Sequence, residues 1–231
     1  MIEFKDVSKR FAHTVALDNF DVTFAKGKIT GLFGPNGSGK STSMKMIAGL
    51  NRPDKGEVTL GGLQPQESKI SIAYLPEIDY FYPWMTIKQA AGFLQAFYAD
   101  WDEAKYKDLL GFLRLEEGMK IAKISKGQRA KAKLLLTVSR RAPYLLMDEP
   151  LSGIDVLTRE EIINTLIRDY REGEQTIIFS THEIAEIESL VDDVVFIEAG
   201  QVKLAGSAED LRINKGMSLL EIMKEEFRNA N

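Results

Sequence analysis

The residues with the clearest chemical potential form a glycine-rich run, GPNGSGKST, at positions 34–42. Glycines let backbone N–H groups turn inward around anionic oxygens, a lysine in such a loop reaches terminal phosphates, and the next hydroxyl can coordinate Mg²⁺. Lys40 and Ser41 occupy these positions, and Thr42 can add a phosphate contact. The residues predicted to bind nucleotide phosphates are Gly34, Pro35, Asn36, Gly37, Ser38, Gly39, Lys40, Ser41 and Thr42.

The glycine run lies where a phosphate site requires it. An apolar strand-like segment, KITGLFG, precedes it, and residues 41–50 follow with helical spacing. The alternative is an ordinary glycine turn before a helix, and the combination of strand, loop, lysine and serine argues against it. The sequence therefore predicts a nucleoside triphosphate site, with Lys40 also acting on the terminal phosphate during catalysis.

A pair of carboxylates supplies the second element of this chemistry. The segment PYLLMDEP is an apolar strand that ends in Asp148 and Glu149. A strand of a parallel sheet emerges at the carboxyl edge, beside the glycine loop. Asp148 is predicted to hold Mg²⁺, and Glu149 is then free to act as general base on the attacking water. Without the glycine loop, these residues could simply end a strand and begin a turn.

The third element is ISKGQR, at residues 124–129, which opens a basic helix. Ser125 suits the N-cap position, and Gly127 leaves room for a phosphate to approach the exposed amides of the helix end. A capping serine before any surface helix would look similar. The position of this motif shortly before the Asp-Glu strand supports its role in phosphate binding.

Hydrophobic periodicity places these motifs in an α/β fold. An antiparallel sheet is expected from strands near the amino end, and a helical lobe is expected to be inserted between strands. The expected strands there are 2–11, 16–24, 28–34, 56–62 and 71–77, and the helices of the lobe are 86–101 and 103–115. The alternating strands and helices that follow predict a parallel sheet with helical crossovers.

The second half of the chain completes that pattern. Residues 192–206 are expected to form a hairpin that turns at Ala199-Gly200. An amphipathic helix is expected from Ser218, with a frayed end. The other expected helices are 125–141, 159–173 and 183–191, and the buried strands are 143–150 and 175–182.

Composition limits the possible functions. The chain has 231 residues, 44% of them hydrophobic, a formal net charge of −4 and a sequence pI near 5.4, a balance that argues against nucleic acid as the main partner. The absence of cysteine excludes disulfides, thiolate metal sites and cysteine nucleophiles. The first residues carry scattered charges, so no signal peptide or anchor is expected, and no apolar run has the length of a membrane-spanning helix.

With its three motifs in this order, the chain resembles the ATP-binding cassette (ABC) family over nearly its full length. GPNGSGKST resembles the P-loop of the family, ISKGQ its signature motif, YLLMDEP its second Walker motif, LSGID its D-loop, and STH its switch histidine motif. The resemblance implies an α/β P-loop NTPase with a mostly parallel sheet core, an N-terminal antiparallel β subdomain and an inserted α-helical subdomain. It implies one domain over 1–231: a catalytic lobe at 1–77 and 143–217, a helical lobe at 78–142, and a C-terminal helix at 218–231.

The resemblance also implies roles for individual residues. His182 would contact the γ-phosphate and help to position the water and the base. Phe11 resembles the aromatic residue that stacks on adenine, although a phenylalanine in the core is an alternative. In the family, two cassettes face each other head to tail, so Ser125, Gly127 and Gln128 would bind the ATP held by the P-loop of the other cassette.

Three positions depart from the usual pattern of the family. Lys126 replaces a glycine of the signature, and Ile154 replaces the common leucine of the D-loop. Glu77 stands where glutamine is usual. Both side chains offer an oxygen to a metal, but glutamate adds negative charge, so Glu77 is predicted as a metal ligand with Ser41 and Asp148. The segment YLPE resembles the bacterial branch that pairs with exporter-type permeases.

The resemblance implies a subunit that binds and hydrolyses ATP, with Mg²⁺, and powers a separate transmembrane permease. The expected location is cytoplasmic, peripheral on the inner face of the membrane, and the second cassette is identical or related. The aromatic cluster Tyr80–Met85 either docks the permease or forms the core of the helical lobe. An ABC ATPase that acts on ribosomes, DNA or iron–sulfur assembly is the main alternative. A kinase or GTPase is disfavoured because no NKxD motif is present.

Overall fold

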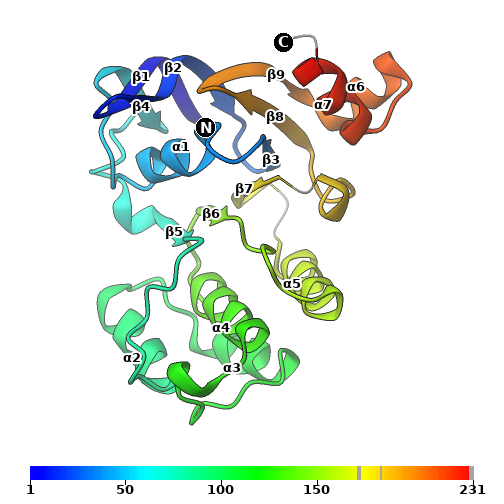
Figure 1. The fold of residues 1–231 in the computed structure, drawn as a ribbon. Helices are drawn as coiled ribbons and strands as arrows, with labels where there is room; N and C mark the ends of the chain where they lie inside the picture. The colour runs from blue at the N-terminus through cyan, green and yellow to red at the C-terminus, as the bar shows by residue number, and fades with distance from the viewer. Residues whose placement is uncertain (171–172, 183, 229–231) are drawn as a thin grey trace.

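The computed structural model describes residues 1–170, 173–182 and 184–228, which form two sheets with α-helices packed between and around them (Figure 1). The strands are β1 (Ile2–Phe11), β2 (Thr14–Phe24), β3 (Ile29–Phe33), β4 (Lys55–Leu60), β5 (Ile72–Leu75), β6 (Tyr144–Asp148), β7 (Thr176–Thr181), β8 (Asp193–Glu198) and β9 (Gln201–Ser207). The α-helices are α1 (Lys40–Ile47), α2 (Ile87–Phe97), α3 (Glu103–Phe112), α4 (Lys126–Val138), α5 (Val156–Asp169), α6 (Ala208–Lys215) and α7 (Leu219–Arg228). Short 3₁₀ turns are η1 (Lys69–Ser71), η2 (Ile121–Lys123) and η3 (Ile184–Glu186).

The larger sheet has the strand order β5-β6-β7-β3-β8-β9. All neighbours in it are parallel except β8 and β9, which pair antiparallel. Asp148 lies opposite Ser180, and Phe33 lies opposite Thr181. The parallel sheet expected from the sequence is confirmed, and its register brings the carboxyl ends of β3, β6 and β7 to one edge.

The smaller sheet is antiparallel, with the order β2-β1-β4. Helix α1 packs between this sheet and the larger one, and its Met44, Met46 and Ile47 are fully buried there. Successive side chains of a strand point to opposite faces, so Leu32 faces this core while Phe33 faces the core on the other side. The N-terminal antiparallel β subdomain is confirmed.

Helices α2, α3 and α4 lie between β5 and β6 in the sequence and form the lower part of the molecule in Figure 1. Each begins at a side chain that accepts a backbone N–H: Thr86, Asp102 and Ser125 are the respective N-caps. One hydrophobic cluster joins the buried residues of these helices to the lower face of the larger sheet. The inserted helical part therefore shares a core with the sheet. In the part of the chain that the structure describes, no helix has the length and apolar character needed to cross a membrane.

The carboxyl-terminal elements follow the expected hairpin. Strands β8 and β9 turn at Ala199 and Gly200, both with positive φ (49° and 79°), as predicted. Helix α6 was not predicted, although Ser207 caps it and Gly216 ends it in a left-handed conformation with φ 63°. Helix α7 confirms the predicted amphipathic helix and buries Leu219 and Ile222, while residues 229–231 lie outside the described part.

The helix predicted over 183–191 is wrong for the residues that the structure describes. Residues 184–186 form the 3₁₀ turn η3, and Glu183 lies outside the described part. The N–H of Ile187 bonds to the carbonyl of Ile184 (3.0 Å), and the N–H of Leu190 bonds to that of Ile187 (2.9 Å). These three-residue spacings define tight turns rather than an α-helix. The helix predicted to end at 173 ends at Asp169, and residues 171–172 fall outside the described part.

Candidate functional site

The glycine-rich loop connects β3 to α1, and its backbone needs its glycines. Gly39 caps α1 in a left-handed conformation with φ 111°, and a Cβ there would lie 2.6 Å from the carbonyl oxygen of Ala16. A Cβ on Gly34 would lie 2.2 Å from the carbonyl oxygen of Ile197. No larger side chain fits either place without a backbone shift. The loop can therefore turn tightly around an anion at the start of a helix.

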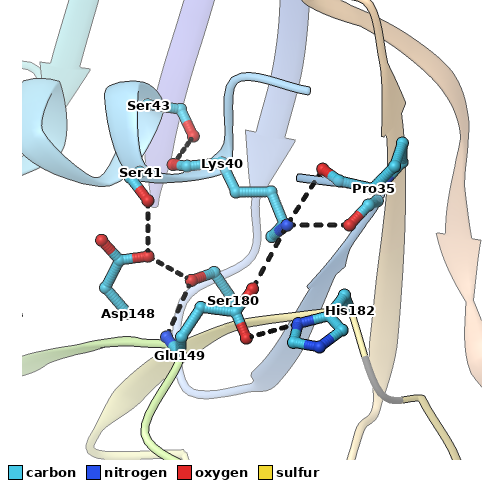
Figure 2. A network of polar contacts seen from close by, with 9 residues as sticks. Pro35, Lys40, Ser41, Ser43, Asp148, Glu149, Ser180 and His182 are labelled. Carbon is cyan, nitrogen blue, oxygen red and sulfur yellow. Dashed lines mark hydrogen bonds and ion pairs between the residues drawn. The ribbon is translucent and has the colours of Figure 1, made fainter. Parts of the chain in front are cut away.

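The Lys40 side chain lies across this loop and is 5% exposed. Its ammonium donates to the carbonyl of Gly34 (2.7 Å) and to that of Pro35 (3.2 Å), as Figure 2 shows for the Pro35 contact. It also lies 3.3 Å from a carboxylate oxygen of Glu149. A buried ammonium between carbonyls and a carboxylate is placed to meet phosphate oxygens entering the loop.

Asp148 stands at the end of β6 and is 2% exposed. Three hydroxyl groups donate to its carboxylate: Ser41 at 3.0 Å, Ser180 at 2.5 Å and Tyr74 at 3.3 Å. Burial and the nearby charge of Asp148 raise the pKa of Tyr74, so this phenol stays protonated and donates. The arrangement confirms that Ser41 and Asp148, far apart in sequence, meet at the sheet edge (Figure 2).

The oxygen atoms of Ser41 and Asp148 suit Mg²⁺. Within the described ranges, no group of three or more histidine, cysteine, aspartate or glutamate side chains could hold a metal ion. Mg²⁺ does not need such a cage, because it is usually held by one or two carboxylates together with substrate phosphates and water. The hydroxyl and carboxylate beside the loop fit that donor set.

Glu149 directly follows Asp148 in the sequence and has a strained backbone conformation, with φ 48°. Its N–H donates to the carbonyl oxygen of Ser180 at 3.0 Å, which anchors it to β7. Its side chain is 7% exposed, with one carboxylate oxygen beside the Lys40 ammonium and the other 3.0 Å from Nδ1 of His182 (Figure 2). The backbone conformation thus aims this carboxylate at the loop rather than at solvent.

A cavity of about 450 Å³ brings most of the predicted nucleotide site together. Phe11 is 46% exposed at its wall, so it is not a core residue. Glu77 and His182 also line the cavity. Its other lining residues are Thr14, Ala16, Asn36, Gly37, Ser38, Gly39, Lys40, Ser41, Thr42, Glu149 and Ser152.

The signature residues Ser125, Gly127 and Gln128 do not line that cavity. They begin α4 in the helical part, where Ser125 accepts the N–H of Gln128 (3.1 Å) and the Gln128 side chain accepts the N–H of Ser125 (3.0 Å). A Cβ on Gly127 would lie 2.9 Å from the hydroxyl of Thr158. This helix end carries a capping box, and Ser125 is exposed.

Two residues of the site were missed in the sequence. Ser180 donates to Asp148 and also accepts the N–H of Glu149 on its hydroxyl (3.2 Å), while Tyr74 donates from β5. The available signal was that each is the first residue of a motif already singled out, Tyr74 of YLPE and Ser180 of STH. Their contacts depend on β6 lying between β5 and β7, an order that no local pattern reveals.

The aromatic cluster Tyr80–Met85 divides into two parts. Met85 is 6% exposed and belongs to the core, with Phe81 packed against it. Tyr82 and Trp84 are 57% and 63% exposed, and their rings stack with centroids 5.6 Å apart. The core alternative therefore holds for Met85 and Phe81, whereas Tyr82 and Trp84 are exposed and their docking role stays a prediction.

A second cavity, of about 510 Å³, lies between the end of α1, β5 and α2. Much of its lining is apolar or aromatic, including Ile78, Tyr80, Leu94 and Tyr98. Ile78 is 70% exposed. This hollow lies next to the loop that carries Glu77, which also lines it.

Strand, glycine loop, helix and acidic strand end define a P-loop nucleoside triphosphatase. A family model described as ABC transporter matches residues 17–152, and the chain belongs to that family. It is similar to the ABC transporter ATP-binding protein NatA of Bacillus subtilis, with 30% identity covering 91% of each chain. It is also similar to the linearmycin resistance ATP-binding protein LnrL of the same organism, with 30% identity over 91% of this chain and 70% of LnrL.

Solved structures show the same fold. An ATP-binding subunit of an ABC transporter superposes with a TM-score of 0.87 at 28% identity, over 98% of this chain and 99% of the other. A dimeric bacterial ABC transporter cassette superposes with a TM-score of 0.80 at 22% identity, over 90% of this chain and 99% of the other. Some relatives are named as import ATP-binding proteins, so the likeness leaves the direction of transport open. The chain is an ATP-binding subunit of the ABC transporter kind.

Proposed function

We propose that this chain hydrolyses ATP with Mg²⁺ and thereby powers a separate membrane permease. The observation that carries the proposal is the position of Glu149, whose buried carboxylate joins Lys40 to His182 beside the Ser41–Asp148 pair. A general base must lie beside the terminal phosphate and close to the metal site. The contact of Glu149 with Lys40 and its place directly after Asp148 support this role.

The residues around Glu149 have separate roles in this mechanism. The loop amides and Lys40 would bind the phosphates. Ser41 and Asp148 would hold Mg²⁺, which would supply positive charge to the phosphoryl oxygens. Phosphate oxygens compete with Glu149 for the Lys40 ammonium. Glu149 is thereby released to accept a proton from water, while His182 keeps its carboxylate oriented. Phe11 offers its exposed ring to the adenine base.

One copy of the chain provides half of each site under this proposal. Ser125, Gly127 and Gln128 do not line the cavity that holds Lys40, which supports their binding a nucleotide held by another cassette. We infer that ATP joins two cassettes head to tail and that hydrolysis separates them. The structural likeness to a cassette that forms a dimer supports this inference.

Replacing Glu149 by Gln tests the proposal directly. The change keeps shape but removes the base, so the rate of hydrolysis should fall roughly 10²–10⁴-fold. ATP then persists, and size-exclusion chromatography with light scattering should show a dimer in ATP and Mg²⁺. The matched control, Lys40→Ala combined with Glu149→Gln, should remain monomeric because it lacks the phosphate contact. An E149Q protein that stays monomeric with saturating ATP would contradict ATP-driven dimerisation.

The proposed surface for the permease combines the apolar hollow lined by Ile78 and Tyr80 with the exposed pair Tyr82 and Trp84. Exposed aromatic side chains beside a hollow suit a protein interface, and the adjoining Glu77 loop leads to the metal site. The chain would then lie on the cytoplasmic face of the membrane through its permease. The YLPE segment is the one feature that supports an exporter as the finer proposal. ATP-driven flux measured in vesicles of defined orientation would test the direction.

A further inference from the structure

Helix α4 carries a stripe of polar side chains, Arg129, Lys133 and Thr137, spaced four residues apart. Residues at this spacing lie on one face of a helix. That face meets the loop at residues 77–80, which follows β5. The stripe begins one turn after Ser125, the N-cap of the same helix.

Lys133 makes the central contact of the stripe. Its ammonium donates to the carbonyl of Glu77 at 2.8 Å and to that of Ile78 at 3.1 Å. The residue is 7% exposed, and burial lowers the pKa of Lys133. A buried ammonium is costly unless its hydrogens are bonded, so the two carbonyls must stay in place to satisfy it. The backbone of Glu77 and Ile78 is therefore tied to α4.

The flanking residues strengthen the same junction. Arg129 donates to the Asp79 carboxylate at 2.7 Å. Thr137 and Tyr80 exchange a hydrogen bond of 3.4 Å between their hydroxyls. Of these three residues, Lys133 is the one that bonds to the backbone carbonyls of Glu77 and Ile78, and so it fixes the backbone from which the Glu77 side chain projects.

We propose that Lys133 is a positioning residue that holds Glu77 at the metal site and ties its loop to the signature helix. Glu77 lines the nucleotide cavity, and Ser125 is the N-cap of the helix that carries Lys133. A shift of α4, when its cap meets the nucleotide of another cassette, would move the Glu77 backbone of its own site. This inference rests on the proposed ATPase function.

The test compares Lys133→Met, Lys133→Arg and the control Lys131→Met. Lys131 lies two residues away on α4, and its ammonium pairs with Glu161 on α5. In K133M, the amides of 77–80 should exchange hydrogen faster in nucleotide-free protein. The Mg²⁺ concentration for half-maximal hydrolysis should rise roughly tenfold. K133R keeps charge and donors and should restore most of both properties, and K131M should leave both unchanged.

If Lys133 acts through Glu77, the effects of substitutions at these two residues should be coupled. In a Glu77→Gln background, K133M should add little further shift to the Mg²⁺ requirement, because the group it positions is already altered. If thermal unfolding shows that K133M does not fold, Lys133→Gln takes its place. The glutamine amide carries no charge but can still donate a hydrogen bond.

The outcomes separate the two proposals. An active wild type whose K133M variant matches K131M in hydrogen exchange and Mg²⁺ requirement would overturn the role of Lys133 alone. Additive effects of K133M and E77Q would also overturn it. A wild type that hydrolyses no ATP with Mg²⁺, even beside its membrane subunit, would overturn the proposed ATPase function and this inference together.

Discussion

At the scale of single residues, the site depends on how Asp148 is held. Its buried carboxylate accepts from hydroxyls on three elements: Ser41 on α1, Tyr74 on β5 and Ser180 on β7. Hydrogen bonds to a charged group are stronger than neutral ones and fix its direction. Ser180 also accepts the N–H of Glu149, so one hydroxyl orients both acidic residues.

Replacing Ser180 by Ala should therefore impair both the metal ligand and the base. We expect ATP hydrolysis to fall roughly tenfold, since partners of metal ligands contribute on this scale. Ser43→Ala is a matched control, because the Ser43 hydroxyl bonds to the carbonyl of Lys40 (2.7 Å) and stays away from Asp148. Steady-state hydrolysis at varied Mg²⁺ measures the effect. Equal rates for S180A and S43A would show that Ser180 does not orient the site.

The sequence was informative about single residues where a motif carries its own chemistry. Lys40, Ser41, Asp148, Glu149 and His182 stand in local patterns, and the structure brings them together as expected. Ser180, Tyr74 and Lys133 could not be found this way. Their contacts cross from one strand or helix to another, and the order of strands comes from packing of the whole sheet.

At the scale of elements, helix ends are fixed by capping side chains. Asp102 begins α3 by accepting the N–H of Lys105 at 3.0 Å. Arg141 also donates to its carboxylate at 2.8 Å. The hydrogen bond from the Lys105 N–H is the main reason why the pKa of Asp102 lies below its ordinary value, and the hydrogen bond from Arg141 lowers it further. The ionised form is therefore favoured in the folded protein.

Asp102→Ala should lower the free energy of unfolding by about 1 kcal/mol at neutral pH. Because the folded pKa is depressed, this stabilisation is present above the ordinary carboxyl pKa. It is lost as the pH falls through the folded pKa. Urea unfolding at neutral pH and below about pH 4 should show the gap between wild type and variant closing in acid. Asp108→Ala, an exposed acid on the same helix, should change stability by less than about 0.5 kcal/mol. A gap for D102A that is independent of pH would refute this explanation.

Errors among the predicted elements have identifiable causes. The segment 183–191, predicted as a helix, has Ile184, Ile187 and Leu190 three residues apart, a spacing that also fits consecutive tight turns. Helix α6 was overlooked because its polar sequence shows little apolar periodicity, and only its Ser207 cap and Gly216 end mark it.

At the scale of the whole molecule, the α/β class with its inserted helices and N-terminal antiparallel sheet was predictable. The alternation of strands and helices specifies such a layered fold. The lobe boundaries at residues 77 and 143 and the exporter branch stay predictions. The division of the aromatic cluster into core and surface could not be foreseen, because it depends on which rings face α2 and its neighbours.

Tyr82→Ala and Trp84→Ala should weaken binding to the proposed membrane permease. Aromatic side chains at the centre of an interface often contribute about 2 kcal/mol, which corresponds to roughly thirtyfold in affinity. Hydrolysis by the isolated chain should not change, because both rings lie outside the nucleotide cavity. Phe112→Ala, another exposed aromatic residue, serves as the control. Unchanged association of both variants with the permease would dismiss this surface.

The exposure of Trp84 has a practical consequence. The chain contains two tryptophans, and the other, Trp101, is partly buried, with its indole N–H bonded to Glu103 at 3.0 Å. Light emission from indole shifts to shorter wavelength when water leaves its surroundings. A partner that covers residue 84 should therefore produce a spectral change that disappears in a Trp84→Phe variant. The emission of Trp84 would thus report the binding of the proposed permease without any attached dye.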